Sequence, residues 1–249
     1  MPVICNLKNG RCPYFPILRD GGEMEKKSIL RRVPLFNKIE DKQLEKIAEI
    51  SLLKKYRKDE DIFSEGEVGD ALYILVSGAV KVFSRSSDGR IKTLAILEKG
   101  DFLGEMAILD REIRSANVRA VEDTEMLIID RRDFETSLTS NPQIAFKIME
   151  TLSARLRDAD KQIESLTFQN VSGRLVIALL DLAEKHGIKT DRGIKIDMEL
   201  THQELAEMVG TAREVVSRIL NDFRKTGCIE VEKHYITITN KEELKRILY

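Results

Sequence analysis

The stretch THQELAEMVGTAREVVSRIL, residues 201–220, decides the fold of the C-terminal part of this chain. It opens with a capping box, because the Thr201 hydroxyl can accept from the third helical amide while Glu204 reaches back to the amide of Thr201. Gly210 permits a tight turn after the first helix. The second helix has one apolar face, made of Val215, Val216, Ile219 and Leu220. Two short helices around a glycine turn are typical of a helix-turn-helix.

The segments on either side extend this motif into a small domain. A helix over 171–186 is predicted before it, with Asn170 as N-cap and Gly187 as its end. A loop then leads to an alternating strand that contains Ile194, Ile196 and Met198. After the motif, Gly227 stops the second helix, and residues 229–232 and 235–238 can pair as a hairpin. The hairpin would form the wing of a winged helix-turn-helix.

The second helix of the motif carries side chains that can read DNA bases. Removing its apolar face leaves seven exposed polar residues: Arg213, Glu214, Ser217, Arg218, Asn221, Arg224 and Lys225. Arginine can donate two hydrogen bonds to guanine, glutamate can accept from cytosine, and serine can do either. The alternative is a solvated face stabilised by a Glu214–Arg218 pair. The capped helix before it and the wing after it favour recognition of DNA.

A long helix is predicted before this domain, over about 28 residues after Pro142. Its apolar positions alternate steps of four and three: Ala145, Met149, Leu152, Leu156, Ala159, Ile163, Leu166 and Asn170. This period of 3.5 indicates a left-handed coiled-coil seam, with Met149, Leu152, Leu156, Ala159, Ile163 and Leu166 as its central positions. A parallel partner helix, and therefore a homodimer, is expected. The alternative is a helix that packs only on its own chain.

The N-terminal half has a different texture. Two short helices are predicted over 28–53, separated at Pro34, with Asp41 as N-cap of the second. From 56 to 130 the chain shows short alternating runs, at 71–76, 80–83, 93–97 and 125–129. Glycines at positions 66, 69, 78, 89, 100 and 104 interrupt them. Short strands with glycine turns indicate a small antiparallel barrel or roll.

The predicted fold class is therefore α+β: an antiparallel β-roll sensor domain, a long dimerisation helix and a C-terminal winged helix-turn-helix. The expected boundaries are 1–27 for an N-terminal extension, 28–140 for the roll, 141–169 for the dimerisation helix and 170–249 for the DNA-binding domain. A change at the hinge 168–170 would rotate the two recognition helices into successive major grooves.

Composition restricts the compartment and the partners. The 249 residues carry 41 Lys+Arg against 42 Asp+Glu, and no apolar run approaches the roughly 18 residues of a membrane span. The start lacks a secretory signal, and three scattered cysteines do not resemble a disulfide framework, so we expect a cytoplasmic protein with no membrane contact. Charge is balanced overall, but Arg213, Arg218, Arg224 and Lys225 outnumber Glu214 and Asp222 on the second helix. Weak non-specific attraction to DNA with base-directed contacts is expected.

The order of these parts resembles the Crp/Fnr family of bacterial transcription regulators, from about Ser28 onward. The segment REVVSR, residues 213–218, is similar to the family's pattern of Arg-Glu, two spacers and Ser-Arg. The resemblance implies that Arg213, Glu214 and Arg218, assisted by Ser217, read a TGA half-site core of a palindromic operator in double-stranded DNA. The phosphate contacts it implies are Thr201, His202 and Thr211. It also implies a regulator that works with RNA polymerase, and it leaves open whether the regulator is an activator or a repressor.

A second segment, FLGEMAILDREIRSANV at 102–118, resembles the phosphate-binding cassette of cyclic-nucleotide-binding domains. The resemblance implies that Arg114 and Ser115 hold a cyclic phosphate and that Glu105 with Gly104 faces the ribose; an arginine, a hydroxyl and free amides suit an anionic group. The same turn also persists in family members that bind no nucleotide. In that alternative an Arg114–Glu105 ion pair pins an empty roll.

Two departures leave the effector open. The positions that contact adenine in cyclic-AMP-responsive members correspond to Ala159 and Asp160, which lack the Thr-Ser hydroxyls, and the cassette is one residue shorter. A cyclic nucleotide is one candidate effector, and another small molecule is a second. An iron–sulfur cluster is disfavoured, because it needs about four thiolates and the chain has only Cys5, Cys12 and Cys228. Haem is disfavoured because all three histidines follow the dimerisation helix. A redox switch through Cys5 and Cys12 stays open.

Other classes of function are less well supported. A nucleotide-binding module that acts on a protein partner is the alternative to a DNA-binding regulator. An enzyme is not expected, since the chain has no Walker loop, nucleophile elbow or histidine-rich metal motif.

Overall fold

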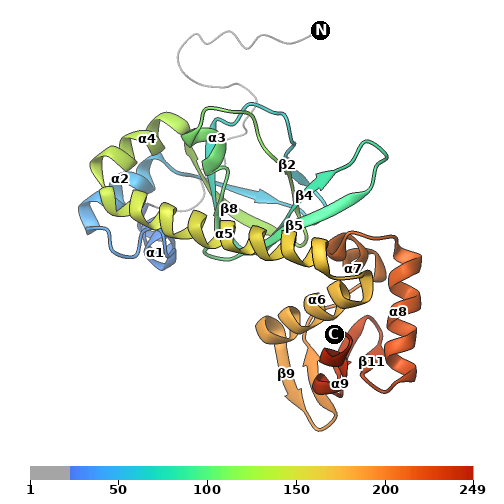
Figure 1. Cartoon of the computed structure of the whole chain (residues 1–249). Helices are drawn as coiled ribbons and strands as arrows, with labels where there is room; N and C mark the ends of the chain where they lie inside the picture. The colour runs from blue at the N-terminus through green and yellow to red at the C-terminus, as the bar shows by residue number, and fades with distance from the viewer. Residues whose placement is uncertain (1–22, 249) are drawn as a thin grey trace.

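The computed structural model describes residues 23–248 and shows three consecutive parts. Figure 1 shows a β-roll with flanking helices, a long helix α5 (Pro142–Phe168) that runs along it, and a C-terminal helical domain at the far end of α5. The predicted α+β class is confirmed. The predicted boundary between residues 27 and 28 falls inside the first helix, α1 (Glu23–Arg32).

The roll consists of two antiparallel four-stranded sheets. The first has the order β1-β8-β3-β6 and consists of β1 (Leu52–Tyr56), β8 (Thr124–Asp130), β3 (Ala71–Ser77) and β6 (Phe102–Leu103). The second has the order β2-β7-β4-β5 and consists of β2 (Asp61–Phe63), β7 (Asn117–Ala120), β4 (Ala79–Arg85) and β5 (Ile91–Glu98). Alternating side chains of both sheets form one core, which includes Leu75, Val80, Val118 and Met126.

Helices cover the outer face of the first sheet. They are α1, α2 (Asp41–Ile50), α4 (Arg131–Ser140) and the first half of α5. A second core joins them to the sheet, with Phe36, Leu44, Phe134 and Ile148 among its buried side chains. The expected N-cap at Asp41 is wrong by one residue: Glu40 occupies that position without a side-chain cap bond. The Asp41 carboxylate instead pairs with Lys27 and Arg31 of α1, which draws it away from the helix amides.

Helix α5 has nearly the predicted length, but two positions of the predicted seam differ from the expectation: Leu152 is partly covered by the roll, and Asn170 lies beyond the helix. Ile144 and Ile148 are buried against the roll, and Leu152 packs partly against the same core. Met149, Leu156, Ile163 and Leu166 are exposed. Asn170 does not continue the seam, because the backbone becomes extended at Gln169 and the Asn170 side chain instead caps the next helix by accepting from the amide of Gly173.

The C-terminal domain begins with α6 (Val171–His186), as predicted. It continues through β9 (Gly187–Thr190), β10 (Gly193–Ile196), α7 (His202–Val209), α8 (Arg213–Lys225), β11 (Ile229–Glu232), β12 (Tyr235–Ile238) and α9 (Lys241–Arg246). The sheet order is β11-β12-β10-β9, so the predicted wing hairpin is confirmed and is joined by two more strands. The segment after Gly187 is strand β9 rather than the expected loop, and β10 ends at Ile196, short of Met198.

The helix layer over the roll gives a stability prediction. Phe134 is fully buried between α4, the sheet and α5, so Phe134→Ala should lower the free energy of unfolding by about 3–5 kcal/mol. Thr136→Ala on the exposed side of α4 is the matched control and should change it by no more than about 0.5 kcal/mol. Urea denaturation of both variants measures the difference. Equal effects would contradict this description of the core.

Candidate functional site

The helix-turn-helix is held by local contacts that the sequence encodes. Both halves of the capping box are present at Thr201 and Glu204. Gly210 adopts a left-handed conformation (φ 73°), which a side chain with a Cβ rarely takes, and this turns the chain between α7 and α8. Arg174 of α6 donates to the Val209 carbonyl at 2.9 Å and to the Gln169 carbonyl at 3.0 Å. The end of α7 is thereby tied to the start of the domain.

Helix α8 presents the predicted reading side chains to solvent. Arg213, Glu214 and Arg218 are exposed near its N-terminal end. Its opposite face is buried in the domain core through Val216, Ile219, Leu220 and Phe223. Figure 1 shows α8 along the outer side of the domain. Within residues 23–248 these three side chains form no hydrogen bond or ion pair, so they can contact a ligand in solvent.

Two of the predicted contact residues bind each other. His202 Nδ1 lies 2.6 Å from the Ser217 hydroxyl, which joins the first turn of α7 to the middle of α8. Burial lowers the pKa of His202, and the positive charge of Arg213 and the nearby His234 lower it further. Thr201 is also engaged, because its hydroxyl donates to Glu204 at 2.7 Å. The Thr211 amide donates to the Ala206 carbonyl at 3.0 Å, at the turn.

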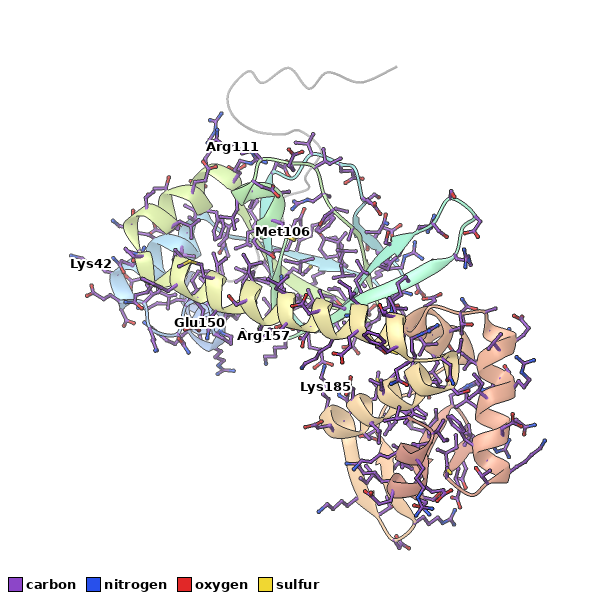
Figure 2. All side chains as sticks on the ribbon, viewed as in Figure 1. Lys42, Met106, Arg111, Glu150, Arg157 and Lys185 are labelled. Carbon is purple, nitrogen blue, oxygen red and sulfur yellow. The ribbon has the colours of Figure 1, made fainter. Side chains whose placement is uncertain are left out.

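The predicted phosphate cassette is a turn followed by a short helix, α3 (Glu105–Leu109). Gly104 before it has φ 85°, and a Cβ there would lie 2.6 Å from Arg114 Nη1 and 2.9 Å from the Ala71 carbonyl. Only glycine suits this close approach. Figure 2 shows the side chains of this part of the roll, with Met106 labelled on α3.

Arg114 points into the roll. It is 3% exposed and donates to the carbonyls of Gly104 at 2.8 Å and Ala71 at 2.9 Å. Its guanidinium also lies 4.4 Å from the centre of the Phe63 ring. The expected alternative of an Arg114–Glu105 ion pair is wrong. Carbonyl groups, not the carboxylate, hold Arg114, and no carboxylate within residues 23–248 forms an ion pair with it.

Glu105 pairs with the long helix instead. The carboxylate is 2% exposed, and its Oε1 accepts from Arg155 Nη1 at 2.7 Å. Arg155 also donates to the Phe102 carbonyl. The second oxygen, Glu105 Oε2, is buried and accepts no hydrogen bond from the described residues. A buried carboxylate oxygen without a donor is uncommon, and it suits a hydroxyl such as that of a ribose.

The remaining effector candidates lie at the surface. Ser115 is exposed, with its hydroxyl 4.0 Å from Met106 Sδ, and Ala159 and Asp160 are exposed on α5. Arg155 is a site residue that the sequence pattern did not single out, although a basic residue one turn before Ala159 was an available signal. Cys5 and Cys12 lie outside the described residues, and Cys228 is buried. Residues 23–248 contain no group of His, Cys, Asp and Glu arranged to hold a metal ion, and no helix among them is long and apolar enough to cross a membrane.

The His202–Ser217 contact gives a prediction on pH. Because folding lowers the pKa of His202, the unfolded chain binds its proton more readily, and the free energy of unfolding should fall as the pH drops through about 6.5. His202→Gln removes the titrating group and should make this fall smaller. Urea denaturation of both proteins at several pH values from about 7.5 to 5.5 measures it. Parallel pH profiles for the two proteins would contradict the assignment.

Comparisons with known proteins agree with this geometry. Residues 53–141 match the cyclic nucleotide-binding domain family, and residues 173–247 match the Crp-like helix-turn-helix domain family. A CRP-like cAMP-activated global transcriptional regulator of Mycobacterium tuberculosis is 31% identical over 88% of this chain and 97% of its own length. The cyclic AMP receptor protein of Thermus thermophilus is 32% identical over 87% of this chain and 97% of its own length.

Solved structures show the same arrangement. The c-di-GMP-responsive global regulator CLP of Xanthomonas campestris superposes with a TM-score of 0.73 at 27% identity, covering 80% of this chain and 99% of that one. A CooA mutant of Carboxydothermus hydrogenoformans superposes with a TM-score of 0.71 at 28% identity, covering 81% of this chain and 89% of that one. With these relatives, an effector-binding domain and a helix-turn-helix, the chain belongs to the Crp/Fnr family of DNA-binding transcription regulators, which are not enzymes.

Proposed function

We propose that this regulator is a homodimer that binds an inverted-repeat operator and is controlled by an effector at the junction of the roll and α5. The proposal rests on two separate exposed surfaces, one polar and one apolar. Arg213, Glu214 and Arg218 are exposed on α8, while an apolar stripe is exposed on α5. One surface suits DNA and the other suits a second copy of the chain.

The operator contacts follow from the chemistry of α8. Arg213 and Arg218 can donate to guanine, and Glu214 can accept from cytosine. A TGA core contains a guanine, and its complementary strand contains the paired cytosine. Thr201, His202 and Thr211 are the proposed phosphate contacts. Ser217 acts together with His202, since the two share a hydrogen bond. RNA polymerase is the proposed protein partner, and the cytoplasm the proposed compartment.

The proposed dimer forms along α5. Leu156 and Ile163 are 64% and 62% exposed, and Met149 and Leu166 extend the same stripe. Burying such a stripe against its copy is the ordinary driving force of a parallel coiled coil. Ala159 lies within it, and Leu152 contributes only in part because it also packs on the roll. Domain boundaries near residues 141 and 170 correspond to the two ends of this helix.

The proposed effector site is the cassette. Arg114 would supply positive charge for an anionic group, Ser115 a hydroxyl and Glu105 an acceptor for a sugar hydroxyl, beside Gly104. The unpaired Glu105 Oε2 and the absence of an acidic partner for Arg114 among the described residues support a cyclic nucleotide. Ala159 and Asp160 would face its base. Relatives described as cAMP-activated and as c-di-GMP-responsive are consistent with a nucleotide of this class.

DNA recognition is tested by selecting an inverted repeat and measuring affinity by fluorescence anisotropy. Arg213→Ala and Arg218→Ala should each weaken binding by about 1–3 kcal/mol, because each removes a bidentate contact to a base. Arg246→Ala on α9 removes an equal charge from the exposed surface of the same domain and should have little effect. If the unmodified protein prefers no inverted repeat, with or without nucleotides, the proposed function is wrong.

The effector is tested by calorimetry with cyclic AMP and cyclic GMP. Ser115→Ala and Glu105→Gln should weaken binding of the preferred nucleotide by about 1–3 kcal/mol each, since each removes a hydrogen bond to a charged group. Arg114→Ala should abolish binding, but it also removes two hydrogen bonds from the roll, so its unfolding is measured alongside. Unchanged binding in Ser115→Ala and Glu105→Gln would exclude the cassette.

A further inference from the structure

A largely buried ion pair connects the roll to the helix-turn-helix. Lys81 on β4 places its Nζ 2.7 Å from Glu207 Oε2 on α7, across 126 positions of sequence. The two side chains are only 17% and 9% exposed. The other carboxylate oxygen, Glu207 Oε1, accepts from Gln203 at 3.0 Å. Both oxygens of this buried carboxylate are therefore satisfied, one of them by the neighbouring domain.

A second lysine of the same hairpin holds the end of α7. Lys92 on β5 donates to the Met208 carbonyl, next to the Val209 carbonyl that Arg174 holds. The last carbonyls of a helix lack partners within it and carry partial negative charge, so two cations suit this position. Burial and the positive charge of Arg174 lower the pKa of Lys92. We call Lys81, Lys92 and Glu207 the latch.

The latch is a discrete contact rather than a graded one. Separating Lys81 from Glu207 while the two domains stay in contact would leave a charge largely buried and without a partner, which is strongly unfavourable. The pair is therefore either made or fully opened to solvent. Once the latch is open, the C-terminal domain is held mainly by its covalent connection to α5, which is the extended backbone at Gln169 and Asn170. Outside the latch, the ion pair between His186 of α6 and Glu98 of β5 also joins the two domains, but at 3.6 Å and with side chains 29% and 54% exposed it is longer and more exposed.

The closed latch leaves the reading face open. It contacts α7 through Glu207 and Met208, whereas Arg213, Glu214 and Arg218 on α8 stay exposed. Figure 1 shows α7 against the roll near the C-terminal end of α5, with α8 on the side away from the roll. In a dimer formed along α5, this arrangement places both reading helices at the same end of the molecule.

We infer that Lys81 and Glu207, together with Lys92, are positioning residues for operator recognition, and that the latched arrangement is the one that binds DNA. This inference rests on the proposed function. When the orientation of α8 is already fixed, the two α8 helices of the proposed dimer can bind two half-sites without the entropic cost of ordering the DNA-binding domains. Opening the latch should weaken binding to an inverted repeat more than binding to a single half-site, because one half-site does not require a fixed spacing.

The test is a charge-swap cycle measured by fluorescence anisotropy on an inverted repeat and on one half-site. Lys81→Glu and Glu207→Lys should each weaken binding to the inverted repeat, on the order of tenfold after the half-site effect is subtracted. The double swap should restore most of the loss. Arg90→Glu, on the exposed tip of the same hairpin, changes the same charge without touching α7 and is the matched control. Lys81→Met and Glu207→Gln replace the swaps if those do not fold.

Amide hydrogen exchange of the segment 164–174 gives a readout that is independent of DNA. Exchange should be faster in each single swap and return toward the unmodified rate in the double swap. Tighter operator binding in the single swaps, or losses that simply add in the double swap, would overturn the inference. Failure of the unmodified protein to bind any inverted repeat would refute the proposed function instead, and the exchange data would still decide whether the latch fixes the domain.

Discussion

The uncovered apolar stripe of α5 is the constraint on which the rest of the structure depends. The first half of the helix is buried against the roll through Ile144 and Ile148, but Leu156 and Ile163 beyond it stay mostly exposed. A contiguous exposed stripe of this kind marks an interaction surface. Because the roll precedes α5 and the DNA-binding domain follows it, a second copy of the chain on this stripe, as proposed, would set the relation between two rolls and two α8 helices.

Each functional surface is tied to the same helix by polar contacts. Glu105 of the cassette pairs with Arg155 in the middle of α5, and Arg174 holds the carbonyl of Gln169 at its end. The Glu105–Arg155 pair therefore links the cassette directly to α5, whose far end carries the DNA-binding domain. Glu105 Oε2 is buried and accepts no hydrogen bond from the described residues, which supports the proposed contact with a hydroxyl of the effector.

Local signals in the sequence predicted most of the fold. The capping box at Thr201, the cap at Asn170 and the glycine turn at Gly210 depend on neighbouring residues, and all three are present. Pairings between distant residues could not be predicted in this way. Arg31 draws Asp41 from its expected cap, and Glu105 binds Arg155 rather than Arg114. Strand β9 was not predicted because all four of its residues are exposed, so its sequence carries no alternation, and the strand depends on pairing with β10.

The central claim is that two chains joined along α5 bind one operator. Sedimentation velocity of the protein, alone and with an inverted-repeat duplex, measures this most directly. We expect a dimer in solution, two chains per duplex, and a monomer without operator binding after Leu156→Lys and Ile163→Lys are combined. A monomeric unmodified protein, or a doubly substituted protein that stays dimeric with full affinity, would contradict the account.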